Sequence, residues 1–151
     1  MAADISINGP DETPFAVFEV KARRGMTSEW AAQFRRNLAV HVGIPPAKYF
    51  GMVTPDRLFL WDTARDRQDS PTAHFSDRLP DFTVDMDDYF SGFPNSAEYT
   101  AQGETFEMLV TYWLNTLLRG EIEGSPKVLE ESGFLRGIRS GHVNLQSARE
   151  A

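Results

Sequence analysis

An aspartate, a glutamate and a lysine near the start of the chain have the types and spacing of a metal-dependent hydrolytic site. Asp4 lies in a short alternating segment, and Glu19 and Lys21 end a segment rich in Phe and Val. Because Glu19 and Lys21 are two residues apart, they share one face of a strand. Two carboxylates at a strand end can hold Mg²⁺, and a neighbouring lysine can offset developing negative charge. This combination predicts cleavage of a phosphodiester bond.

A predicted hairpin decides which aspartate can join Glu19. Residues 2–7 alternate between polar and apolar types and residues 15–20 are rich in Phe and Val, so both are predicted strands. The Asn-Gly and Pro-Asp pairs between them are typical of a turn. A turn centred near the middle of this linker brings Asp4 opposite Glu19. Asp11 would lie at its tip, ~26 Å from Glu19 at the rise of a strand, so Asp4 is the predicted partner.

The next elements are a helix and two strands. Thr27 suits an N-cap, and Trp30, Phe34 and Leu38 form an apolar stripe with a four-residue repeat. Gly43 and the two prolines after it predict the end of this helix. Strands are then predicted at Tyr49–Val53 and Arg57–Trp61.

The resulting order of strand, strand, helix, strand, strand predicts an α/β fold with a central mixed sheet. At this point the chain resembles the PD-(D/E)xK nuclease superfamily. It is most similar to the small nuclease-like domains at the start of type I restriction motor subunits and to their solitary bacterial relatives. The matching residues span about residues 3–62 and are Asp4, Phe18-Glu19-Val20-Lys21, Gln33 and the strand Tyr49–Val53.

The resemblance implies both a fold and a site. The fold is a restriction-endonuclease-like mixed sheet with flanking helices. Asp4 and Glu19 would bind Mg²⁺ or Mn²⁺, Lys21 would be the catalytic lysine, and Gln33 would support the site. The substrate would be nucleic acid, and the setting would be bacterial defence or mobile-element biology.

Two positions depart from the family pattern. The family has a helix and a strand before its first aspartate, whereas only residues 1–3 precede Asp4 here. Helices from the C-terminal half, or a partner chain, are expected to fill that place. The second departure is Ala3, which stands where the motif name has proline.

The rest of the chain is predicted to belong to the same domain as the nuclease-like core at residues 1–62. Residues 63–103 read as a loop-rich connection, with a short helix at Val84–Phe90. The aspartates in that helix, Asp85, Asp87 and Asp88, are interpreted as an acidic helix start or a solvated face.

Residues 104–151 are predicted to be helical. The strongest helix is Glu104–Arg119, which looks apolar nearly all round, and a shorter helix is expected at Pro126–Glu131. Glycines then break the pattern, at Gly133, Gly137 and Gly141. The long helix carries an apolar face that should either be buried within the chain or form the contact with a protein partner or a second copy; its residues are Phe106, Trp113 and Leu117.

Composition bounds the function further. The net charge of −7 disfavours nucleic-acid binding, although basic residues are concentrated within residues 21–36. The chain has no cysteine, which excludes thiolate metal sites and suits a reducing cytoplasm. No apolar run is long enough to span a bilayer, so we expect a cytoplasmic protein with no membrane contact.

Two alternatives to the nuclease stay open. One is a catalytically inactive interaction module that keeps the nuclease fold and binds a protein partner or dimerises. The other is a structural protein in which Glu19 and Lys21 form a surface pair, since Glu-x-Lys on a strand is most often a solvated face.

Overall fold

A computed structural model of the chain describes residues 4–9, 14–69, 78–90, 103–119, 127–139 and 146–147. Four residues named in the sequence analysis, Ala3, Asp11, Pro126 and Gly141, lie outside these ranges.

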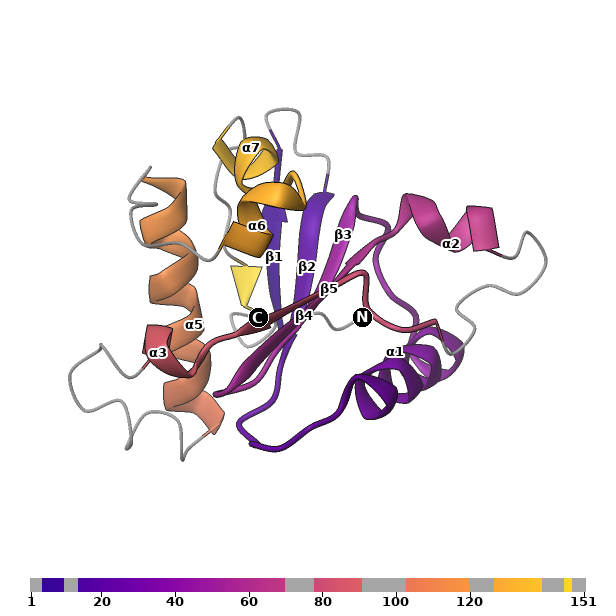
Figure 1. The fold of residues 1–151 in the computed structure, drawn as a ribbon, viewed down its shortest axis with the longest axis horizontal. Helices are drawn as coiled ribbons and strands as arrows, with labels where there is room; N and C mark the ends of the chain where they lie inside the picture. The colour runs from indigo at the N-terminus through magenta and orange to yellow at the C-terminus, as the bar shows by residue number, and fades with distance from the viewer. Residues whose placement is uncertain are drawn as a thin grey trace.

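A six-stranded mixed sheet forms the centre of the molecule (Figure 1), in the order β5-β4-β3-β2-β1-β6. Neighbouring strands are antiparallel except β2 and β3, which are parallel. The predicted mixed α/β sheet is therefore confirmed. The strands are β1 Ile5–Asn8, β2 Pro14–Val20, β3 Tyr49–Val53, β4 Arg57–Asp62, β5 Phe82–Asp85 and β6 Gln146–Ser147.

The parallel pair follows from the helix between its strands, because a parallel neighbour needs a crossover connection. That helix, α1 (Ser28–His41), begins as predicted at Thr27, whose side chain accepts a hydrogen bond from Trp30 N. It ends at Gly43, where φ is 95° and the backbone N–H bonds Leu38 O. The other described helices are α2 Ala64–Asp69, α3 Asp87–Phe90, α5 Gly103–Leu118, α6 Lys127–Glu131 and α7 Phe134–Arg139.

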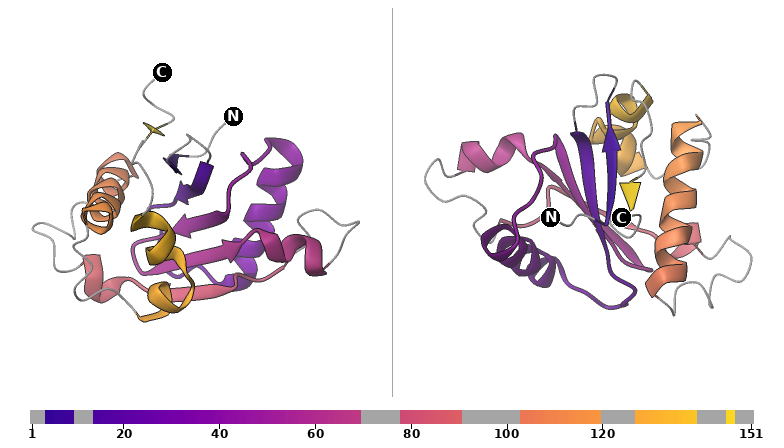
Figure 2. Two further views of the ribbon diagram at one scale, coloured as in Figure 1. Left: turned by 90° about the horizontal axis from the view of Figure 1, so that it is seen from above. Right: turned by 180° about the vertical axis from the view of Figure 1, so that it is seen from behind.

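Helices cover both faces of the sheet (Figures 1 and 2). The α1 helix lies on one face, and α5, α6 and α7 lie on the other. Alternation along the strands sends side chains to two separate cores. Val17, Phe50 and Met52 pack toward α1, whereas Phe18, Val53 and Leu60 pack toward the C-terminal helices.

The C-terminal half thus supplies the cover for one whole face of the sheet. The α5 side chains Phe106, Trp113 and Leu117 are fully buried in this core. The apolar face of α5 was expected either to be buried or to form an interface. It is buried within the chain, so it is not available to a partner. Met108 and Tyr112, which extend the apolar surface of α5, are 68% and 52% exposed, so the outer side of this helix is not buried within the chain.

Residues 63–103 contain more regular structure than the predicted loop-rich connection, namely α2, β5 and α3 in their described part. The predicted helix at Val84–Phe90 was wrong in its first half. Val84 is buried and pairs with Leu58 in the sheet, so strand pairing outweighs the local helical pattern there. The helix begins only at Asp87, whose backbone N–H donates a hydrogen bond of 2.9 Å to Asp85 Oδ1.

Gly137 does not break the helical pattern as expected, because it lies inside α7. A Cβ at this position would overlap the ring of Phe15 from β2. Glycine is therefore needed here for close approach between the helix backbone and an aromatic ring, and not for a turn.

Candidate active site

The β1–β2 hairpin brings Asp4 to Glu19. Ile5 pairs with Phe18, so the next step along the two strands places Asp4 beside Glu19. Asp4 Oδ2 accepts a hydrogen bond of 2.8 Å from the backbone N–H of Val20. The pairing of Ile5–Ile7 with Ala16–Phe18 agrees with the predicted register, and the pairing then shifts by one residue between Ile7 and Asn8.

Glu19 occupies an interior position on the α1 side of the sheet. It pairs with Met52 of β3 and follows Val17 by two residues, so it shares the face on which the α1 core is built. Its side chain is only 5% exposed, and its Oε1 has no hydrogen-bond partner in the part of the chain that the structure describes. The alternative in which Glu19 and Lys21 form a surface pair is therefore wrong for Glu19.

The surroundings of Glu19 favour its protonated form when no cation is present. Burial is the largest cause, followed by repulsion from the Asp4 carboxylate. The charge of Lys21 acts in the opposite direction, while a hydrogen bond to Asp4 and the charge of Glu107 add to the upward shift. Together they raise the pKa of Glu19 to about 8. The raised pKa favours a protonated Glu19 at neutral pH, in a place where a cation would relieve the same repulsion.

Lys21 lies one step beyond the carboxyl pair. Its backbone N–H donates to Val53 O at 2.9 Å, which fixes the end of β2 against β3. Its Nζ lies 4.5 Å from the centroid of the Phe34 ring on α1. Within the described ranges Lys21 forms no salt bridge. The ammonium group is therefore near the carboxyl pair without being paired to it.

Gln33 is not joined to this group of residues. It is exposed on α1, and no hydrogen bond among the described residues links it to Asp4, Glu19 or Lys21. Its supporting role stays a prediction, because the structure neither brings it to the carboxyl pair nor assigns it another role.

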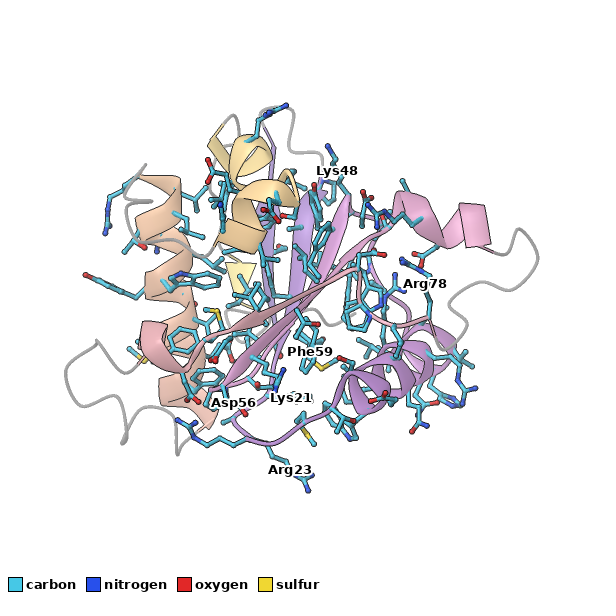
Figure 3. The ribbon with its side chains drawn as sticks, viewed as in Figure 1. Lys21, Arg23, Lys48, Asp56, Phe59 and Arg78 are labelled. Carbon is cyan, nitrogen blue, oxygen red and sulfur yellow. The ribbon has the colours of Figure 1, made fainter. Side chains whose placement is uncertain are left out.

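The segment after Lys21 is tied to two loops at the same end of the sheet. Gly25 N donates to Asp56 Oδ2 at 3.2 Å, and Arg24 Nη1 contacts Asp87 Oδ1 at 2.6 Å. Figure 3 labels Lys21 and Asp56 at this end, and Lys48 and Arg78 toward the other. The sequence analysis did not single out Asp56, or Glu107, a buried α5 residue whose charge raises the pKa of Glu19.

One of the basic residues within residues 21–36, Arg35, does not lie beside Glu19. Arg35 is only 2% exposed and points to a different part of the molecule, where its guanidinium bonds both oxygens of Asp66. It also lies over the rings of Phe50 and Trp61, 5.5 and 5.2 Å from their centroids. The sequence shows no difference between Arg35 and its exposed neighbours, because the burial of Arg35 depends on α2.

The donor set at this end of the sheet fits one hard cation with open positions. No group of three or more His, Asp or Glu side chains in the described ranges is arranged to hold a metal ion. Mg²⁺, however, commonly binds through one or two carboxylates and keeps several waters. Asp4 and the buried, unpartnered Glu19 oxygen supply such a pair.

Comparison of the chain with protein-family models, curated proteins and solved structures gave no match. None of the helices that the structure describes has both the length and the apolar character needed to cross a membrane.

Proposed function

We propose that this chain is a Mg²⁺-dependent nuclease-like domain that hydrolyses phosphodiester bonds of nucleic acid. The observation that carries the proposal is the convergence of Asp4, Glu19 and Lys21 at one end of the central sheet, with Glu19 buried and one of its oxygens unpartnered. A buried carboxyl oxygen without a hydrogen-bond partner destabilises the fold, and such groups are concentrated at functional sites.

Each of the three residues has a role that follows from its place. Asp4 and Glu19 would hold the cation, and the Val20 N–H would keep the Asp4 carboxylate in position. The bound cation would polarise the scissile phosphate and lower the pKa of a water molecule. Lys21, with no salt bridge in the described part of the chain, would orient the attacking water and offset charge on the phosphate oxygens.

The interaction module is the less favoured alternative. Its expected contact surface, Phe106, Trp113 and Leu117, is buried within the chain. The net charge of −7 disfavours broad electrostatic binding of nucleic acid, so the proposed contact would have to be local. A site that holds a cation and an adjacent lysine provides that local contact.

A cleavage assay tests the proposal. Purified protein is incubated with single- and double-stranded DNA and RNA in Mg²⁺ or Mn²⁺, with and without EDTA. We expect metal-dependent cleavage that Lys21→Ala reduces by at least about a hundredfold, a loss typical of a group that stabilises transition-state charge. Lys48→Ala is the matched control, because Lys48 is exposed and lies at the other end of the sheet. Equal activity of Lys21→Ala and wild type would rule out this assignment.

A further inference from the structure

The contact between Lys21 and Phe34 has no counterpart in the sequence motif and joins two different elements. The ammonium lies 4.5 Å from the ring centroid, well inside the roughly 6 Å range of a cation–π interaction. Phe34 belongs to the apolar stripe of α1, so its presence is also explained by core packing. The question is whether its ring has a second role toward Lys21.

Both partners of this contact are held in place. Trp30 stacks on Phe34 with ring centroids 5.4 Å apart and an interplanar angle of 25°. The backbone N–H of Trp30 donates a hydrogen bond to the side chain of Thr27, the N-cap residue of α1. On the other side, the Lys21 backbone is fixed by its bond to Val53 O. The ring face is therefore a rigid support for an otherwise flexible four-carbon side chain.

An aromatic ring suits this position better than a carboxylate would. Lysine side chains lose substantial rotamer entropy when they are ordered, so an unsupported Lys21 would sample many positions. An ion pair with Asp4 or Glu19 would order it, but would occupy oxygens that the cation needs. The ring of Phe34 attracts the ammonium without supplying a competing ligand.

We propose that Phe34 is a positioning residue for Lys21, whose ammonium it holds beside the Asp4–Glu19 carboxyl pair. This inference rests on the proposed function, since it assigns Phe34 a part in the same site. The ring acts through Lys21 and does not itself touch the reacting atoms.

The first test reads the contact without any substrate or metal. The chain has only three lysines, Lys21, Lys48 and Lys127, so their ε-methylene signals are readily assigned in a carbon–proton correlation spectrum. We expect the Lys21 signal to lie upfield of that of exposed Lys127, because it sits over a ring face. Phe34→Leu should abolish the upfield shift and Phe34→Tyr should retain it. Leu38→Ala, on the same stripe of α1, should destabilise the fold but leave the shift in place.

The second test reads the consequence for catalysis. In Phe34→Leu we expect kcat to fall roughly tenfold, the rate equivalent of one such contact, with KM nearly unchanged. Phe34→Tyr should restore kcat, and Leu38→Ala should not lower it. Phe34→Met, which fills space without a ring, replaces Phe34→Leu if the latter does not fold.

The outcomes separate the two proposals. An unshifted Lys21 signal in wild type, or full activity in folded Phe34→Leu, would overturn the positioning role while leaving the nuclease intact. A wild type that shows the shift but cleaves no nucleic acid would overturn the nuclease, and with it the role of Phe34.

Discussion

Asp4 Oδ2 accepts a 2.8 Å hydrogen bond from the backbone N–H of Val20, the residue that separates Glu19 from Lys21. This single bond ties the start of β1 to the end of β2 and keeps the aspartate beside Glu19, whose side chain it contacts. Because the bond is to backbone, the arrangement depends on hairpin register and not on the identity of residue 20. The candidate site is thus a direct product of the β1–β2 pairing.

The buried Glu19 makes stability depend on pH. Its pKa is raised from 4.5 to about 8 in the folded chain, chiefly by burial. Between these values the folded chain keeps a proton that the unfolded chain has lost, so the free energy of unfolding should fall as pH rises from about 5 to 8. The expected loss is of the order of 3 kcal/mol without added metal. Urea unfolding across this pH range measures it.

Glu19→Gln and Glu29→Gln serve as test and control for that dependence. Glu19→Gln removes the titrating group. The free energy of unfolding of this variant should vary less with pH and should exceed that of wild type at pH 8. The second removes an exposed glutamate on α1 and should leave the slope unchanged. A wild-type slope identical to that of Glu19→Gln would show that Glu19 is not protonated at neutral pH.

Two aspartates that both contact arginine should differ sharply in their contribution to stability. Asp66 receives bonds from buried Arg35 and from Arg78, whereas Asp87 meets Arg24 at the surface. Burial raises the pKa of Asp66, but the bonds from the two arginines outweigh it and the net shift is downward, so Asp66 is charged at neutral pH.

Asp66→Asn should therefore lower the free energy of unfolding by about 3–5 kcal/mol, because it removes a charged partner that bonds the buried Arg35 guanidinium through both oxygens. Asp87→Asn should change it by about 0–1 kcal/mol, as expected for an exposed pair. Denaturant unfolding of the two variants at pH 7 gives the comparison, and equal losses would contradict the burial argument.

Gly137→Ala tests the close approach of α7 to Phe15. Alanine normally favours a helix over glycine, but here its Cβ would overlap the ring, so we expect a loss of about 1–3 kcal/mol. Adding Phe15→Leu should recover part of this loss, because the smaller side chain frees the space. Thermal unfolding of the two single variants and the double variant measures the coupling. Simple additivity would mean that the ring does not limit position 137.

Local patterns were enough to predict the part of the fold around the site. Turn residues set the β1–β2 register, and the Thr27 cap with the Trp30–Phe34–Leu38 stripe defined α1. A hairpin and an amphipathic helix are specified by neighbouring residues, so one sequence suffices to predict them. The same local patterns therefore allowed the proximity of Asp4 and Glu19 to be predicted.

The features that sequence reasoning missed depend on residues far apart in the chain. Glu19 was predicted as a site residue, but Glu-x-Lys on a strand is also typical of a solvated face, and only the packing around β2 decides for burial. No local pattern distinguishes Arg35 from its exposed neighbours, because its burial depends on Asp66 of α2. Gly137 resembled a helix breaker because nothing local shows that Phe15 packs against it. Each of these outcomes is decided by tertiary packing, which periodicity does not encode.

The most direct measurement is the location of Mn²⁺ in crystals of the wild-type protein, found by anomalous diffraction. The account predicts a single strong peak between Asp4 and Glu19, with ligand oxygens at about 2.1 Å, and no such peak in crystals of Glu19→Gln. Mn²⁺ bound elsewhere in a protein that cleaves nucleic acid, or no bound ion at these carboxylates at any metal concentration that supports cleavage, would contradict it.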